Sequence, residues 1–517
     1  MDLTDLPPAP ALAAHARLVA AIRDGRPFDH PVLRVEAIET HISTILLAGE
    51  FAYKLKKPVD LGFVDFTTLE KRRRCCEEEV RLNRRTAPQL YVGVVPISGS
   101  VDRPVVAGEG TPIEYAVKMR RFAPDATLDA LLRRGALAPE RFDQLAARVA
   151  DFHRSIPVAA PASRYGLPSL IRETALDNFR QTRIHVEDRA SLEALASLEA
   201  WTQAEFGRLR ATFEERQRLG FVRECHGDLH LGNVALIDDR PIPFDCIEFS
   251  APLRWIDVMS EAAFTVMDLL AHRERPLAFR FLNAYLEKTG DYAGVSVLRF
   301  YLVYRALVRA KVAAIRRSSA DFEGYLRLAE TLSGPPVPAL VITSGLSGSG
   351  KTTLARSLAG VLGAVHIRAD VERKRLHGIE SMARAGAPVD EGIYAPQATA
   401  ATYEHMAQLA RAVLAGGFPA IVDATFLRRS QRSTFRELAD RMGARFVIVR
   451  SEAPLDVLRA RLIVRTPDAS DATAAVLERQ RASEEAFTRA EVDSVVVCQT
   501  LDRECAAALA GAAARLS

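Results

Sequence analysis

The sequence predicts two folded parts of different class, an α+β part followed by an α/β part with a parallel sheet. Three patterns lead to this prediction. Residues about 32–120 contain short alternating apolar segments, which are typical of strands. Residues about 125–330 carry mainly helical periodicity. From residue 339 onward, strand and helix patterns alternate, as expected of an open parallel sheet.

The composition is that of a globular protein and argues against several function classes. Of the 517 residues, 48% are hydrophobic and 26% charged, and the net charge of +4 is too small to predict a nucleic-acid surface. No uncharged apolar run reaches the length of a membrane span, and the acidic, proline-bearing start differs from a signal peptide. The six cysteines include no C-x-x-C pair. We therefore expect a cytoplasmic protein with reduced thiols and without a membrane or nucleic-acid partner; its oligomeric state stays open.

A proline-rich joint separates the two parts. Residues 333–338 read Ser-Gly-Pro-Pro-Val-Pro, which cannot continue a helix and predicts a short, stiff linker. The length of the chain also favours two or three domains. We therefore expect a first domain at residues 1–333, a linker at 334–338 and a second domain at 339–517.

The second domain begins with a phosphate-binding pattern. Residues 345–352 read Gly-Leu-Ser-Gly-Ser-Gly-Lys-Thr and match G-x-x-x-x-G-K-[ST] between a strand pattern and a helix pattern. In such a loop the backbone N–H groups bind phosphate, the lysine reaches the β- and γ-phosphate oxygens, and the threonine can ligate Mg²⁺. We expect nucleotide binding at Gly345, Ser347, Gly348, Ser349, Gly350, Lys351, Thr352 and Thr353. The strands expected in this domain are 339–344, 364–368, 418–423, 445–450 and 494–498.

A second motif lies in the first domain. Asp228 is followed five residues later by Asn233, and Asp245 comes after a short apolar strand pattern. Phosphoryl transfer needs such a set, because one carboxylate orients or deprotonates the attacking hydroxyl while an Asn and a second Asp hold Mg²⁺ against the phosphates. His-x-Asp-x-x-x-x-Asn is also the spacing of the protein-kinase catalytic loop, with Gly227 in the place of arginine. A polar turn between helices is the alternative interpretation.

The run His226-Gly-Asp-Leu-His-Leu-Gly-Asn233 resembles the aminoglycoside phosphotransferase family, whose signature is His-Gly-Asp-x-His-x-x-Asn. The resemblance covers roughly residues 35–330. It implies a bilobal, protein-kinase-like fold that binds ATP between a small lobe at about 32–120 and a helical lobe at about 125–330. It further implies that Asp228 is the catalytic base and that Asn233 and Asp245 are the metal ligands. His226 would brace the loop, and His230 would support it locally.

A kinase-like small lobe also needs a strand lysine for the α- and β-phosphates and a helix glutamate that pairs with it. Lys54 lies in a plausible strand, and Glu79 lies in a helix pattern downstream, so we expect these two residues to pair. Lys56 points to the same strand face under two-residue alternation and remains an alternative. Residues 39–44 stand where a Gly-rich loop would cover the phosphates.

The second domain resembles the small P-loop kinases, a group that includes gluconate, adenylylsulfate, polynucleotide 5′-end and zeta-toxin-type kinases. Asp370 follows a strand and fits a catalytic base or substrate-orienting role, with a helix N-cap as the alternative. Arg373 fits an anchor for an anionic group, and Asp423 fits a ligand of Mg²⁺-bound water. Arg461 and Arg465 lie four residues apart and resemble the arginine-bearing lid of these kinases, with a salt-bridged helix surface as the alternative.

Together these motifs predict a bifunctional ATP-dependent phosphotransferase that uses Mg²⁺ in both halves and transfers the γ-phosphoryl group to a hydroxyl of a small molecule. In one alternative, one nucleotide site is a sensor that regulates the other. In another, the second half is a polynucleotide 5′-end or toxin-like kinase. The acceptors stay open: Asp257, Glu261 and Asp268 offer an acidic cleft for a polycation, but the segment 305–317 is basic.

Overall fold

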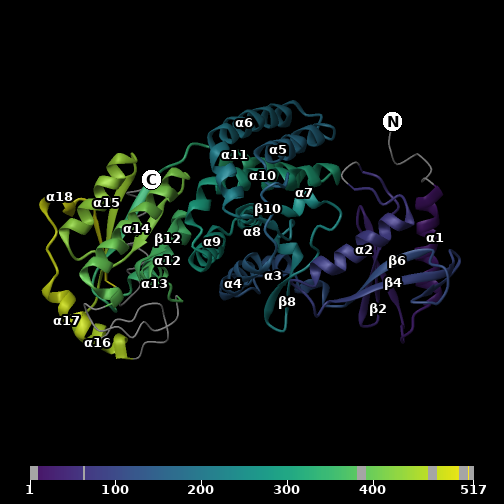
Figure 1. The fold of residues 1–517 in the computed structure, drawn as a ribbon, viewed down its shortest axis with the longest axis horizontal. Helices are drawn as coiled ribbons and strands as arrows, with labels where there is room; N and C mark the ends of the chain where they lie inside the picture. The colour runs from purple at the N-terminus through teal and green to yellow at the C-terminus, as the bar shows by residue number, and fades with distance from the viewer. Residues whose placement is uncertain (1–9, 62–63, 381–391, 464–473, 500–510, 512–517) are drawn as a thin grey trace. The chain divides into compact units, whose positions relative to one another are not determined.

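The computed structural model describes residues 10–61, 64–380, 392–463, 474–499 and 511 (Figure 1). Internal packing divides the chain into two compact units. Unit 1 comprises residues 1–144, 151–166 and 216–261, and unit 2 comprises residues 145–150, 167–215 and 262–517. Unit 2 therefore combines helical segments with the parallel-sheet part. The domain boundaries expected from the sequence stay a prediction.

Unit 1 is built on a six-stranded antiparallel sheet in the order β1-β2-β3-β6-β4-β5. Its strands are β1 (Val35–Glu39), β2 (Ser43–Ala48), β3 (Phe51–Lys56), β4 (Tyr91–Ser100), β5 (Arg103–Val106) and β6 (Glu114–Arg120). Two helices pack on this sheet, α1 (Pro10–Gly25) and α2 (Leu69–Asn83). Other helices that begin in this unit include α3 (Leu128–Arg133), α4 (Glu140–Ser155) and α7 (Ala251–Arg254).

Strand β3 carries different chemistry on its two faces because successive side chains of a strand alternate. Tyr53 and Leu55 are buried in an apolar core to which α1 contributes. Lys54 and Lys56 point to the other face, where Glu79 of α2 meets them. The sheet thus separates its apolar core from a cluster of charges.

A tight hairpin brings the acidic end of the second motif back to its asparagine. The antiparallel strands β8 (Val234–Ile237) and β9 (Arg240–Pro243) are joined by two residues with φ of 47° and 63°, as a type I′ turn requires. Asn233 precedes β8 and Asp245 follows β9. The N–H of Phe244 donates to the Asn233 carbonyl at 2.9 Å, so both ends of the hairpin lie together. A second short ladder pairs β7 (Val222–Glu224) with β10 (Trp255–Asp257).

The helices of unit 2 surround a long apolar helix. Helix α10 (Val295–Ile315) is buried on most of its faces and packs against α5 (Pro168–Arg183) and α11 (Ser319–Ser333). Further helices are α6 (Arg189–Arg218), α8 (Val258–Ala271) and α9 (Arg275–Thr289). In the described ranges, no helix has both the length and the apolar character needed to cross a bilayer.

The rest of unit 2 is a five-stranded parallel sheet in the order β12-β13-β11-β14-β15. The strands predicted from the sequence are confirmed, with ends that differ by at most two residues: β11 (Ala339–Ser344), β12 (Val365–Arg368), β13 (Ala420–Asp423), β14 (Arg445–Glu452) and β15 (Val495–Gln499). Because β11 lies between β13 and β14, its carboxyl end opens where the strand order reverses, the position at which such sheets bind ligands.

Helices cover the parallel sheet. Leu354 and Leu358 of α12 pack on Val341 and Val449, which buries one face of β11 and β14. The helices of this part are α12 (Lys351–Leu362), α13 (Ala369–Leu376), α14 (Pro396–Ala415), α15 (Arg429–Arg441), α16 (Leu455–Ile463), α17 (Ala474–Ala482) and α18 (Arg489–Val492).

A buried ion pair joins α18 to α15, and we expect its loss to destabilise the protein. Arg432 Nε donates to Glu491 Oε1 at 2.6 Å, and both side chains are buried. Arg432→Met leaves Glu491 without its partner, so the free energy of unfolding should fall by about 3–5 kcal/mol. Arg441→Met, at an exposed pair with Glu437, should change it by about 0–1 kcal/mol. Urea unfolding followed by circular dichroism measures both; equal changes would contradict the prediction.

Candidate active sites

In unit 1, residues 225–233 form a catalytic-type loop after β7. Asn233 Nδ2 donates to the backbone carbonyl of Asp228 at 3.0 Å and to its carboxylate at 2.9 Å. His230 Nε2 lies 3.5 Å from the same carboxylate. The Asp228 side chain is about one third exposed, so it can still reach a substrate hydroxyl. The structure therefore brings the predicted base and the predicted metal ligand Asn233 into direct contact.

Asp245 adopts a backbone conformation that is costly for a residue with a side chain. Its φ is 66°, in the left-handed region, and its N–H donates to the Tyr91 hydroxyl at 3.1 Å. Its carboxylate forms an ion pair with Lys54, and 40% of the Asp245 side chain is exposed. The residues predicted to bind metal and phosphate in this half, Asn233, Asp245 and Lys54, are thus gathered around the end of the β8–β9 hairpin.

The expected ion pair between Lys54 and Glu79 is present, and it belongs to a larger cluster. Lys54 Nζ donates to Glu79 Oε1 at 2.9 Å, while Lys56 Nζ pairs with the other oxygen of Glu79 and with Glu248. Burial would raise the pKa of Glu79, but the two ammonium groups hold it down at about 2. Burial would lower the pKa of Lys54, but the carboxylates of Asp245, Glu79 and Glu248 raise it well above its ordinary value.

The two lysines differ in what they can reach. The Lys56 side chain is completely buried between two carboxylates, whereas Lys54 contacts the partly exposed Asp245. A phosphate can approach Lys54 from the side of Asp245. The geometry therefore favours Lys54 as the phosphate-binding lysine and gives Lys56 a structural role between β3, α2 and the segment after Asp245.

Glu261 anchors the catalytic-type loop, a role that the sequence did not reveal. Its carboxylate accepts the backbone N–H groups of His226 at 3.0 Å and Gly227 at 2.7 Å, and it lies 3.0 Å from His153 Nε2. Burial would raise the pKa of Glu261, but His153 and these hydrogen bonds lower it to about 2. Gly227 has a φ of 88°, and a Cβ there would lie 2.8 Å from the Leu253 carbonyl, which explains glycine at this position.

His226 joins the loop to the segment before Asp245. Its Nε2 lies 2.8 Å from the Phe244 carbonyl, and its Nδ1 accepts the N–H of Asp228 at 3.3 Å. Burial lowers the pKa of His226, which favours the neutral ring that this pair of hydrogen bonds requires. The brace implied by the family resemblance has this geometry.

The three carboxylates that could have contributed to an acidic cleft are all buried. Asp257 is buried and makes a two-fold hydrogen-bonded ion pair with Arg216 at 2.7 and 2.8 Å. Glu261 is completely buried in its contacts with the loop, and Asp268 is also buried. Spacing alone did not distinguish these internal carboxylates from surface ones.

In unit 2, the phosphate loop (residues 345–352) connects β11 to α12 as predicted. Gly345, Gly348 and Gly350 all have positive φ, and a Cβ at Gly345 would lie 2.3 Å from the Ser451 carbonyl. Lys351 opens α12, and its Nζ donates to the Leu346 carbonyl at 2.7 Å. Two other predicted residues, Ser347 and Ser349, lie in the loop before the helix. Thr352 and Thr353 lie in the first turn of α12.

Asp423 ends β13 next to the phosphate loop. Its carboxylate lies 3.3 Å from the Thr343 hydroxyl and 3.3 Å from His366 Nε2. Burial would raise its pKa, but hydrogen bonds from His366 and Thr352 and the charge of Arg368 hold that pKa far below its ordinary value. The Thr352 hydroxyl and the Asp423 carboxylate form an oxygen donor set of the kind that Mg²⁺ prefers, so the residues fit the expected ion.

Asp370 and Arg373 lie on α13, directly after β12. Helix α13 begins at Ala369 with Arg368 as its N-cap, so the alternative that Asp370 caps the helix is wrong. Arg373 is buried, stacks on Tyr394 and donates to the Thr399 hydroxyl at 3.0 Å. Among the described residues its buried Nε has no hydrogen-bond partner. A buried N–H donor normally has an acceptor, so this atom is an exception among the described residues.

Two further segments reach the phosphate loop. Arg461 of α16 donates to the Gly348 carbonyl at 3.2 Å, whereas the predicted Arg465 lies outside the described residues. Gln480 of α17, which the sequence did not single out, accepts the N–H of Ser347 at 2.8 Å.

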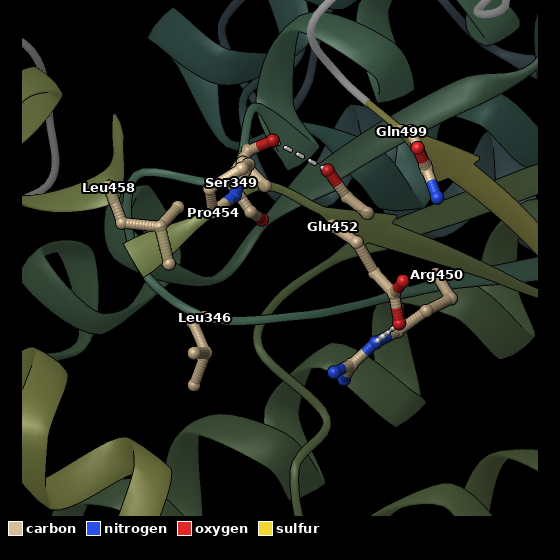
Figure 2. Close-up of a pocket in the computed structure, with 9 residues that line it drawn as sticks. Leu346, Ser349, Arg450, Glu452, Pro454, Leu458 and Gln499 are labelled. Atoms are coloured by element: carbon tan, nitrogen blue, oxygen red, sulfur yellow. Dashed lines mark hydrogen bonds and ion pairs between the residues drawn. The ribbon is translucent and has the colours of Figure 1, made fainter. Parts of the chain in front are cut away.

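A cavity of about 340 Å³ opens beside the phosphate loop at the carboxyl ends of β14 and β15 (Figure 2). It combines apolar side chains with polar groups at its edge. The labelled residues that line it are Leu346, Ser349, Arg450, Glu452, Pro454, Leu458 and Gln499. The cavity therefore lies at the edge of the sheet where parallel α/β sheets bind ligands.

Comparison with known proteins identifies relatives along most of the chain. Residues 340–487 match the family described as AAA domain. Over 462 residues the chain is 31% identical to the uncharacterized protein Rv2004c of Mycobacterium tuberculosis (strain ATCC 25618 / H37Rv), covering 88% of this chain and 91% of the relative. The uncharacterized protein Mb2027c of Mycobacterium bovis (strain ATCC BAA-935 / AF2122/97) matches to the same extent.

Solved structures are similar to each half separately. A gluconokinase from Sinorhizobium meliloti 1021 covers 35% of this chain and 93% of its own, at 24% identity and a TM-score of 0.26. The GDP complex of wild-type aminoglycoside 2′-phosphotransferase-IIIa covers 62% of this chain and 98% of its own, at 14% identity and a TM-score of 0.38. The structure confirms the predicted class of each part: an α+β part with an antiparallel sheet precedes a parallel α/β part that carries the phosphate loop.

We expect the two small-lobe lysines to respond differently to the same substitution. Lys54→Met should weaken ATP binding at the unit 1 site by about tenfold or more, because a charge-assisted contact to phosphate is lost. Lys56→Met should instead lower the free energy of unfolding by about 3–5 kcal/mol, because it removes the positive charge that lies between the buried carboxylates of Glu79 and Glu248. Calorimetric ATP titration in a Lys351→Ala background, with urea unfolding of each variant, separates the effects. If Lys56→Met weakened ATP binding and Lys54→Met mainly lowered the free energy of unfolding, Lys56 would be the phosphate ligand.

Anchoring by Glu261 should show a defined pH dependence. Its folded pKa of about 2 lies below the ordinary value of 4.5, so its contribution to stability is fully present above about pH 4.5 and is lost as the pH falls toward 2. Glu261→Gln should therefore cost about 3 kcal/mol at pH 7, and the difference from wild type should shrink below pH 4.5. Urea unfolding across this pH range measures it. The exposed Glu77→Gln variant should differ little from wild type at any pH; a pH-independent effect of Glu261→Gln would refute the anchoring.

Proposed function

The chain belongs to the family of the mycobacterial protein Rv2004c, and from its two sites we propose that it is a bifunctional ATP-dependent phosphotransferase. Both halves have kinase-like, ATP-binding folds. The observation that carries the proposal is that each half gathers its own set of phosphoryl-transfer groups. Unit 1 combines Asp228, Asn233 and Asp245 with Lys54, and unit 2 combines the phosphate loop with Asp423.

In the first half, Asp228 is proposed as the base for the acceptor hydroxyl. Its hydrogen bond with Asn233 orients the carboxylate, and its partial exposure leaves it accessible. Asn233 and Asp245 would hold Mg²⁺, which neutralises phosphate charge when bound. Lys54, already held by Glu79, would bind the α- and β-phosphates once Asp245 engages the metal.

In the second half, the phosphate loop is proposed to bind the β- and γ-phosphates through its N–H groups and Lys351. Thr352 and Asp423 would hold Mg²⁺ directly or through water. Asp370 would orient or deprotonate the acceptor hydroxyl. Arg373 Nε has no hydrogen-bond partner among the residues that the structure describes, which supports an acceptor that carries an anionic group. Arg461 would neutralise charge on the transferred phosphoryl group.

The acceptors are proposed to be small hydroxyl-bearing metabolites. The carboxylates near the first site do not favour a polycation, because Asp257 already pairs with Arg216 and Glu261 already accepts N–H groups of the loop. The net charge of +4 does not favour nucleic acid. We also propose that the protein works in the cytoplasm, where ATP is supplied to both sites.

Measurement of ADP release with Mg-ATP against sugars, sugar acids, amino alcohols and nucleosides tests the proposal. Wild type should turn over at least one acceptor. Asp228→Ala and Lys351→Ala should each abolish activity toward different acceptors, by about a hundredfold or more, because each removes a charged group that acts on the reacting phosphoryl system. If both sites bind ATP, no acceptor is turned over and nucleotide changes the conformation, the sensor alternative replaces the proposal.

A further inference from the structure

One contact of the phosphate loop is not explained by the groups assigned above. The N–H of Ser347 donates to the side-chain carbonyl of Gln480 at 2.8 Å, across 133 residues of sequence. Ser347 lies inside the loop whose N–H groups are expected to bind phosphate. A phosphate oxygen and the Gln480 carbonyl are both acceptors, so they compete for the same N–H group.

Gln480 is held in place by its surroundings. One turn earlier on α17, Leu477 is completely buried. Beyond the helix, the N–H of Glu485 donates to the Leu427 carbonyl at 3.0 Å, and Arg432 donates to the Glu485 carbonyl at 3.3 Å. The helix is therefore fixed on both sides of Gln480, and the side chain is directed at the loop.

The neighbouring charges favour an uncharged amide at this position. Lys351 and Arg461 both contact carbonyl groups of the same loop, at 2.7 and 3.2 Å, so the surroundings of Ser347 are cationic. Glu478, two residues before Gln480, is turned away toward Arg459 and Arg481 at the surface. A carboxylate at position 480 would satisfy the cationic loop but would repel a bound phosphate.

We propose that Gln480 determines the preference of this site for a triphosphate over a diphosphate, an inference that rests on nucleotide binding at the phosphate loop. When a phosphate oxygen accepts the N–H of Ser347, rotation of the terminal amide directs Nε2 of Gln480 toward that phosphate. The same side chain thus accepts from the loop when phosphate is absent and donates to the nucleotide when phosphate is bound. An amide can do both without a change of charge, whereas a carboxylate can only accept. The contact thereby links α17 to the number of phosphates bound.

The test is calorimetric titration of the full chain with Mg-AMPPNP and with Mg-ADP, in a Lys54→Met background that weakens the unit 1 site. We expect Gln480→Glu to weaken AMPPNP binding about tenfold or more relative to ADP, through like-charge repulsion at the terminal phosphate. Gln480→Ala should reduce the same ratio less, because it removes a donor without adding a charge. Glu478→Gln, on the exposed side of the helix, is the matched control and should leave the ratio unchanged.

Three other results would overturn the inference. Equal changes for both nucleotides, or no change in Gln480→Glu, would mean that Gln480 only supports the loop. If the wild-type protein shows no nucleotide binding that depends on Lys351, the proposed function of this half is overturned, and the inference with it. Circular dichroism of each variant shows whether the fold is retained, and the ratio of two affinities is insensitive to a partly unfolded fraction.

Discussion

The Glu79 carboxylate lies completely buried between the ammonium groups of Lys54 and Lys56, and the organisation of unit 1 follows from that contact. A charge taken out of water is stable only when an opposite charge and hydrogen bonds replace the solvent. Glu79 therefore holds β3 against α2, and Lys56 extends the cluster to Glu248 behind Asp245. Asp245 itself, in a strained left-handed conformation, is kept in reach of Lys54 by the same set of charges.

The catalytic-type loop obeys the same constraint through a different partner. The Glu261 carboxylate accepts two backbone N–H groups and contacts His153. This buried carboxylate therefore fixes the start of the loop that carries Asp228 and Asn233. His226 then connects this loop to the hairpin that carries Asp245. In unit 2 the corresponding charge is Asp423, which is stabilised by His366 and by the hydroxyls of Thr343 and Thr352. In both units, buried charges with several partners hold the segments that carry the proposed site residues.

Much of this arrangement could be read from local sequence patterns. The five parallel strands, the phosphate loop and the shared orientation of Lys54 and Lys56 all follow from short periodicities, and the structure has each of them. The N-cap interpretation of Asp370 was wrong because the cap is Arg368, two residues earlier, and helix ends depend on contacts outside the helix. Whether Asp257 faces a cleft stayed open in the sequence, because spacing does not reveal that Arg216 lies opposite it.

The sequence by itself determined the kind of chemistry: glycines that permit a phosphate loop, and an Asp, Asn and Asp set at kinase-like spacing. These signals are local, since a few adjacent residues decide backbone conformation and side-chain type. Only the tertiary structure decided which buried groups support them. Glu261 meets the loop from 35 residues away and Gln480 meets Ser347 from 133 residues away. Such pairs form because chain topology brings distant polar groups into one low-dielectric interior, where each must find a partner.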